Sequence, residues 1–259
     1  PDVVASLMGS YTQSAKLFGV RNVIFTDSEH QNFNHCIAHP FADEIFTPEC
    51  FYKKLGSKQK RYNGIHELMF LRPSRFQADE RVLTHYRELE PGGYILLRKS
   101  SWNTLHDVGH QGMGDGLKGF VQKYSRKYRI LMSSEEGSRL ALPGVESQHI
   151  APEHFHDLLA FSAFVLTEGA STASEAACLG VPTVYINSTE NLGYLRMLES
   201  EFGIVKAFLE SADGLCCAGA WLDRLEPYPR IARAEFRSNL EARFSDGAEF
   251  VVTRLLKSR

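Results

Sequence analysis

Few cysteines and no long apolar run occur in this sequence, and each absence excludes a class of protein. The five cysteines are an odd number, and no two of them are spaced as Cys-x-x-Cys. A secreted disulfide framework and a common zinc site are therefore excluded, and a reducing, cytoplasmic location is expected. No apolar run reaches the roughly 18 residues that a membrane span needs, and no signal-peptide pattern opens the chain.

An excess of charge of one sign is also lacking. The formal net charge is −2, from 29 basic and 31 acidic residues. This balance gives no overall attraction to nucleic acid, so no nucleic-acid partner is expected. The histidines and acids form no metal-ligand spacing, and no Asp-x-Asp triplet occurs. We therefore expect no metal and no cofactor. Any bound anion must be met by helix N-termini or single arginines.

What the sequence does contain is an alternation of strand and helix patterns. Continuous apolar runs, typical of buried parallel strands, are followed by segments with helical spacing or by glycine turns. This alternation predicts an α/β fold with parallel sheets. The expected strands lie within residues 1–9, 21–30, 42–49, 58–71, 92–102, 129–137, 164–167 and 181–187, and the expected helices are 10–20, 50–56, 116–128, 151–163, 171–180 and the region after 226.

These patterns fall into two series, separated near residues 72–79. We therefore expect two Rossmann-like domains. Residues 1–72 would be the C-terminal part of an N-terminal domain, and residues 73–259 a C-terminal domain that ends in a helix. The chain opens at Pro1, in the middle of a strand pattern and without a methionine, so the N-terminal domain is expected to be incomplete in this chain.

The segment from residue 164 to residue 186 has the pattern of an anion site. Gly169 and Ala170 carry little or no side chain, so a ligand can approach their backbone closely. Ser171 and Thr172 are natural N-caps for the following helix, whose N-terminus attracts anions. Glu175 follows about one turn later, where a carboxylate can accept both hydroxyls of a ribose. Such residues also suit an ordinary helix start, so spacing alone leaves a purely structural role open.

This segment, EGASTASEAACLGVP, resembles the donor-binding signature of MurG-like GT-B glycosyltransferases, which act as undecaprenyl-linked N-acetylglucosaminyltransferases. That resemblance implies diphosphate contacts at Gly169, Ala170 and Thr172 and a ribose contact at Glu175. Nearly the whole chain, including TDSEH, RYNGIHEL and LLRKSSWNTLHDVG, is similar to the domain-of-unknown-function family 354. The family resemblance implies a GT-B fold, related to that of UDP-GlcNAc 2-epimerases.

Four residues are candidates for acid–base catalysis. Glu29 and His30 follow a predicted strand at its carboxyl end, the edge that faces the ligand in open α/β sheets. They could act as acid or base or orient an acceptor, or they could only stabilise the loop. His106 and Asp107 could be a second such pair or a salt-bridged loop clamp.

Other residues are candidates for binding a nucleotide-sugar. Arg98 ends a predicted strand and could neutralise a phosphate. By analogy with GT-B enzymes, the region around His156 lies near the nucleobase, and Asn191 lies near the donor sugar. The predicted binding set is Arg98, Ser101, Trp102, Glu135, His156, Gly169, Ala170, Ser171, Thr172, Glu175 and Asn191.

The sequence therefore predicts a glycosyltransferase that moves a sugar from a nucleotide-sugar, with UDP-sugar favoured, to a glycan or lipid-linked acceptor. No metal is needed if helix-dipole and arginine charge stabilise the departing nucleoside diphosphate. A nucleotide-sugar 2-epimerase and a non-catalytic nucleotide-sugar-binding protein are alternatives. Peripheral membrane contact and the oligomeric state stay open.

Overall fold

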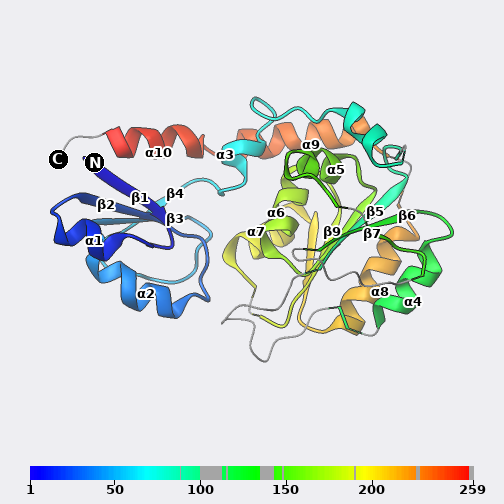
Figure 1. Cartoon of the computed structure of the whole chain (residues 1–259), viewed down its shortest axis with the longest axis horizontal. Helices are drawn as coiled ribbons and strands as arrows, with labels where there is room; N and C mark the ends of the chain where they lie inside the picture. Colours follow the sequence, from blue (N-terminus) through cyan, green and yellow to red (C-terminus); the bar gives the residue numbers. More distant parts are fainter. Residues whose placement is uncertain are drawn as a thin grey trace. The chain divides into compact units, whose positions relative to one another are not determined.

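The chain forms two compact units, each with its own parallel sheet (Figure 1). The first contains residues 1–70, 192–194 and 240–259, and the second contains residues 71–191 and 195–239. The two parallel α/β sheets predicted from sequence are thereby confirmed. This computed structural model describes residues 1–87, 89–99, 113–114, 116–134, 143–147, 149–189, 191–225 and 228–256.

The first unit has a four-stranded sheet in the order β1-β2-β3-β4, with every pair parallel. Alternate residues of β2 face opposite sides, and Val23, Ile24 and Phe25 are all buried, because both faces of the sheet are covered. Ile24 packs with Ala38 of helix α2 on one face. The elements are β1 (Val3–Leu7), α1 (Thr12–Leu17), β2 (Arg21–Phe25), α2 (Asn32–Ala38), η1 (His39–Phe41), β3 (Glu44–Pro48), β4 (Gln59–Tyr62) and α3 (Leu68–Leu71).

Helix α10 (Gly247–Leu256) covers the other face of this sheet. Its Phe250 ring lies 5.3 Å from those of both Phe46 and Tyr62. The boundary expected from sequence placed residues 240–259 with the second domain, whereas in the structure they cluster with the first unit. Apolar packing against the sheet accounts for this placement.

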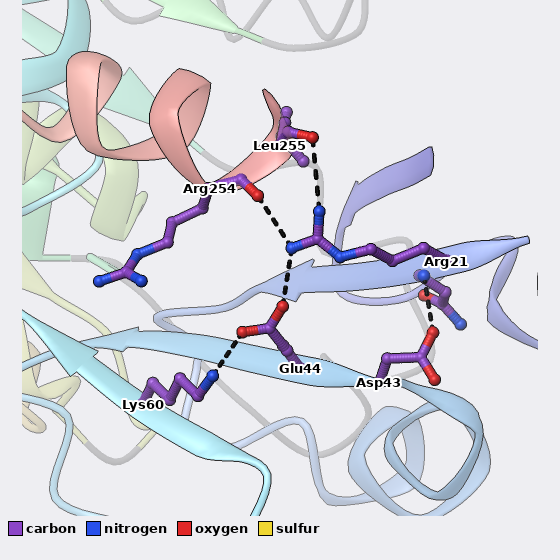
Figure 2. Close-up of polar contacts among 7 residues, drawn as sticks. Arg21, Asp43, Glu44, Lys60, Arg254 and Leu255 are labelled. Atoms are coloured by element: carbon purple, nitrogen blue, oxygen red, sulfur yellow. Dashed lines mark hydrogen bonds and ion pairs between the residues drawn. The ribbon is translucent and has the colours of Figure 1, made fainter. Parts of the chain in front are cut away.

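A charged network holds the end of α10 against the strands (Figure 2). Nη2 of Arg21 donates to the Glu44 carboxylate at 2.7 Å and to the backbone oxygen of Arg254 at 2.8 Å. Nη1 of Arg21 donates to the backbone oxygen of Leu255 at 3.4 Å. Lys60 from β4 donates to the second oxygen of Glu44 at 2.6 Å. One arginine therefore satisfies carbonyl groups that the end of a helix leaves without intrahelical partners.

The second unit has a six-stranded sheet in the order β10-β9-β8-β5-β6-β7, again with parallel pairs. Helices α4 and α8 pack on one face of it, and Figure 1 shows α5 and α6 on the other. The elements are η2 (Glu80–His85), β5 (Tyr94–Lys99), α4 (Gly116–Tyr124), β6 (Arg129–Ser134), β7 (Glu146–Ser147), η3 (Pro152–His154), α5 (Phe155–Phe161), β8 (Phe164–Thr167), α6 (Ala170–Cys178), β9 (Thr183–Ile186), α7 (Gly193–Phe202), β10 (Val205–Phe208), α8 (Ser211–Leu222) and α9 (Arg230–Arg243).

One predicted helix is wrong. Residues 50–56 are irregular, although their spacing suggested a short helix. The Gln59 side chain accepts from the backbone N–H of Leu55 at 2.8 Å and donates to the backbone oxygen of Lys53 at 3.2 Å. Phe51 is fully buried. The backbone of this segment thus finds its partners in a side chain from β4, and tertiary contacts override a weak helical pattern.

Candidate functional site

The turn from β8 into α6 is held by hydrogen bonds at the carboxyl edge of the second sheet. The Thr167 hydroxyl accepts from the backbone N–H of Gly169 at 2.9 Å. The Glu168 carboxylate, which is buried, accepts from the backbone N–H of Met113 at 2.8 Å, and its backbone oxygen accepts from the Asn187 amide at 3.0 Å. The start of α6 therefore has a defined position at the end of a buried strand.

The predicted capping of α6 is wrong. Gly169 is the N-cap residue, and no side chain caps the helix. Ser171 and Thr172 lie inside the helix, because it begins one residue before Ser171. The backbone N–H groups of Ala170, Ser171 and Thr172 therefore have no acceptor within the helix. They form a helix N-terminus of the kind that binds anions.

The glycine before this helix is not required by the fold. Gly169 has φ −95°, which any residue can adopt. The atoms nearest to a Cβ atom there would belong to Thr167 and Thr172, at 3.6 Å or more, which is ordinary contact. Neither backbone conformation nor packing thus explains a glycine here, and close approach of a ligand would.

The side chains of Glu175 and His156 meet between α6 and α5. Oε1 of Glu175 lies 3.3 Å from Nε2 of His156, and the two side chains are 17% and 29% exposed. The His156 ring has edge contacts with Phe76 and Phe155, at centroid distances of 6.0 and 5.9 Å. The carboxylate predicted to bind ribose therefore lies beside a histidine predicted for the same site.

Arg98 lies at the same edge of the sheet. Arg98 is in β5 and pairs in register with Thr167 of the neighbouring strand β8. Its Nη1 donates to the Ser133 hydroxyl at 2.5 Å, and its guanidinium lies 5.3 Å from the centre of the Phe155 ring. A positive charge, a helix N-terminus and a carboxylate thus occupy the carboxyl end of adjacent parallel strands, the usual ligand position in such sheets.

Six further residues are predicted for the site from sequence, and two of them, His106 and Asp107, are predicted as catalytic residues. Asn191 belongs to the second unit and is partly buried. Ser101, Trp102, His106, Asp107 and Glu135 lie outside the described residues.

In the first unit, Glu29 is fully buried. Its carboxylate accepts from the backbone N–H of Tyr52 at 3.2 Å and from that of Gly193 at 3.1 Å. Burial raises the pKa of Glu29, although these two N–H groups oppose the shift by stabilising the charged form. A carboxyl whose pKa is raised is more readily protonated than a solvent-exposed one, which suits a group that exchanges a proton. His30, the next residue, is partly buried.

His66 is not among the site residues predicted from sequence. Its Nδ1 lies 2.8 Å from Oδ2 of Asp27, which follows β2, and its ring stacks on that of Tyr62 at 6.2 Å. Burial opposes charge on both groups, but their hydrogen bond and mutual attraction outweigh it. The pKa of His66 is therefore raised and that of Asp27 lowered. The signal available in the sequence was that His66 follows β4 at the edge where Asp27 follows β2.

Within the described ranges, no three histidines, cysteines or acids are grouped in a way that could hold a metal ion. Over the same residues, no helix combines the length and apolar character needed to cross a membrane.

Comparison with solved structures defines the class of fold. UDP-GlcNAc 2-epimerase from Methanocaldococcus jannaschii, in complex with UDP-GlcNAc and UDP, is similar with a TM-score of 0.66 and 12% identity, over 99% of this chain and 75% of that chain. The Neisseria meningitidis enzyme bound to UDP-GlcNAc gives 0.62 and 14%, over 100% and 76%. The spinosyn forosaminyltransferase SpnP gives 0.57 and 12%, over 98% and 75%. The fold is of the GT-B type.

The family follows from the sequence. Residues 13–206 match the model of the family described as "Protein of unknown function (DUF354)", and the chain belongs to this family. No curated protein sequence matches the chain.

Proposed function

We propose that this protein is a glycosyltransferase-like enzyme that uses a nucleotide-sugar, with UDP-sugar as the donor, and that its second unit binds the donor. The observation that carries the proposal is the uncapped N-terminus of α6 after Gly169. Glu175 lies about 1.4 turns beyond Ala170 by the usual helix repeat of about 3.6 residues. The similarity to nucleotide-sugar enzymes of the same fold agrees with it.

In this proposal the diphosphate lies against the backbone N–H groups of Ala170–Thr172. These groups and the helix dipole favour a negative charge. Arg98 from the neighbouring strand adds a full positive charge, and a guanidinium can bind two phosphate oxygens at once. Charge that develops on the departing diphosphate would thus be stabilised by groups already in place.

The acid–base chemistry is assigned mainly to the first unit. Glu29, with its raised pKa, and His30 are the proposed proton-transfer residues of this unit. His106 and Asp107, which belong to the second unit, are proposed as a further acid–base pair. The acceptor is proposed to be a glycan or a lipid-linked sugar, which would bring the protein to a membrane surface from the cytoplasmic side.

The first test is a thermal-shift screen against nucleoside diphosphates and nucleotide-sugars. A ligand at 100 times its Kd stabilises the native state by about 2.7 kcal/mol, which raises the melting temperature by about 5–10 °C for a protein of this size. We expect UDP to stabilise the parent protein and not Glu175→Ala. Glu235→Ala, an exposed glutamate on α9, is the matched control and should respond like the parent. The proposal fails if no nucleoside diphosphate shifts the parent.

A 2-epimerase is the second candidate, and one observation favours it. Asp27 and Glu29 follow β2, His66 and Glu67 follow β4, and His66 lies 2.8 Å from Asp27 in the first unit. Glu29 and Glu67 are buried, and Asp27 and His66 are partly buried. Epimerisation needs several acids and bases near one sugar carbon. If NMR shows that a UDP-sugar is converted to its 2-epimer in the absence of any acceptor, this candidate is favoured over a transferase. A protein that binds the donor but shows no transfer, hydrolysis or epimerisation would be a binding protein.

A further inference from the structure

The contact between His156 and Glu175 joins two elements that the proposed nucleotide site needs. Glu175 comes from α6 and His156 from α5, and Nε2 and Oε1 are 3.3 Å apart. The Nε2 atom of His156 is buried, whereas the Glu175 side chain keeps 17% of its surface exposed. The Oε1 atom of Glu175 thus faces a buried histidine nitrogen, and the exposed part of the Glu175 side chain stays accessible to a ligand.

We propose that His156 is a positioning residue, which fixes the Glu175 carboxylate so that it can accept both hydroxyls of the ribose of a bound nucleoside diphosphate. This inference rests on the proposed function, since it requires a nucleotide at the start of α6. It assigns His156 a role through Glu175 and not through direct contact with the nucleobase.

The chemistry of the carboxylate allows both contacts at once. An ionised carboxylate has two oxygens and about four lone-pair positions. A ribose diol uses two of them, so the His156 ring, whose Nε2 atom lies 3.3 Å from Oε1, does not have to be displaced. A free glutamate side chain would lose rotamer freedom when it binds a diol, and this loss costs about 0.5–1.5 kcal/mol for each immobilised side chain. A glutamate that His156 already holds avoids part of this loss.

The surroundings of His156 keep its ring in place. The rings of Phe76 and Phe155 make edge contacts with the His156 ring, at interplanar angles of 76° and 60° respectively. Phe155 also lies under the Arg98 guanidinium. The same aromatic side chain therefore packs against both the positioning histidine and the arginine proposed to bind phosphate, so α5 supports both ends of the proposed nucleotide site.

The experiment is isothermal titration calorimetry of the full chain with UDP and with 2′-deoxy-UDP. We expect His156→Ala to weaken UDP binding about 5- to 20-fold, the range typical for losing preorganisation or one charge-assisted hydrogen bond. We expect a clearly smaller loss with 2′-deoxy-UDP, because one of the two hydroxyls is then absent. His156→Gln keeps an N–H donor and should retain most of the affinity.

A double-mutant cycle separates positioning from independent binding. In a Glu175→Ala background, His156→Ala should cause little further loss, since coupled residues are not additive. His85→Ala, an exposed histidine of the same unit, is the control and should bind like the parent.

Equal losses for UDP and 2′-deoxy-UDP, or independent effects of the two substitutions, would overturn the inference while leaving the proposed function intact. Absence of UDP binding by the parent would instead overturn the proposed function itself. If His156→Ala does not fold, the cycle is run with His156→Leu, which also lacks an N–H donor, and Glu175→Gln, and the two effects on UDP binding should still be less than multiplicative.

Discussion

Arg233 carries a positive charge into the interior of the second unit. Only 6% of this residue is exposed. Its Nη1 donates to the backbone oxygens of Ala160 and Ser162 at 2.9 Å, and its Nη2 donates to that of Ala163 at 3.3 Å. These oxygens lie at or just after the C-terminal end of α5, where a helix has unsatisfied carbonyl groups and favours a cation. The burial of the arginine lowers its pKa, although the Tyr228 hydroxyl opposes this.

Replacing this arginine should destabilise the protein. We expect Arg233→Met to lower the free energy of unfolding by about 2–4 kcal/mol, because several buried carbonyl groups lose their donor. Urea denaturation followed by circular dichroism measures it. Arg230→Met, on the same helix but with an ion pair to Glu80 that is largely exposed, should change the free energy by less than about 1 kcal/mol. Similar effects of the two substitutions would contradict this account.

The Asp27–His66 pair predicts a pH dependence of stability. The folded pKa of His66 is raised above its usual 6.5, so the stabilisation is complete below pH 6.5 and is lost as pH rises through the folded pKa. The folded pKa of Asp27 is lowered from 3.8, so its contribution is present above pH 3.8 and is lost as pH falls through the folded value. The pair therefore stabilises the first unit most between these limits.

His66→Gln should remove this dependence. The stability difference between parent and variant should be greatest near pH 5–6 and should shrink as the solution becomes alkaline. Urea midpoints measured at intervals from pH 5 to pH 9 provide the comparison. A difference that stays constant with pH would show that the two groups are not linked to folding as an ion pair.

At the scale of elements, helix α10 completes the core of the first unit. Phe250 lies between the rings of Phe46 and Tyr62, while Val252 on the same helix is 54% exposed. We expect Phe250→Ala to lower the free energy of unfolding by about 2 kcal/mol, below the usual range for a fully buried phenylalanine because the side chain is only partly buried. Val252→Ala should change it by less than about 0.5 kcal/mol. Denaturation of both variants tests whether this helix stabilises the sheet by packing.

Some secondary-structure predictions are correct and others are wrong, and apolar periodicity and hydrogen bonding explain the difference. Strand β5 is predicted correctly because burial on both faces requires a continuous apolar run. Helix α4 is predicted correctly because its buried residues recur at helical spacing, at Leu117, Phe120, Val121 and Tyr124. The helix predicted at 50–56 does not form, because Gln59 from β4 satisfies its backbone and Phe51 is buried. The capping prediction for Ser171 and Thr172 is wrong because the helix begins at Ala170. Boundaries depend on hydrogen bonds that a pattern does not specify.

At the scale of the whole molecule, the chain runs from the first unit to the second and returns. The first unit contains both residues 1–70 and residues 240–259. A division of the chain at residue 72 would therefore separate one face of the first sheet from the helix that covers it. The sequence does not show this, because an amphipathic helix near the end of a chain can pack against either domain.

The sequence by itself determined the α/β class, the parallel sheets, the family, and the position of the segment from Gly169 to Glu175 at the end of a strand. Each of these follows from local periodicity or from a contiguous motif, in which neighbouring residues carry the information. The tertiary structure alone decided that His66 meets Asp27, that His156 meets Glu175 and that α10 packs on the first sheet. These pairs are far apart in the chain or on different elements, and only the packing of the strands and helices brings their side chains within contact distance.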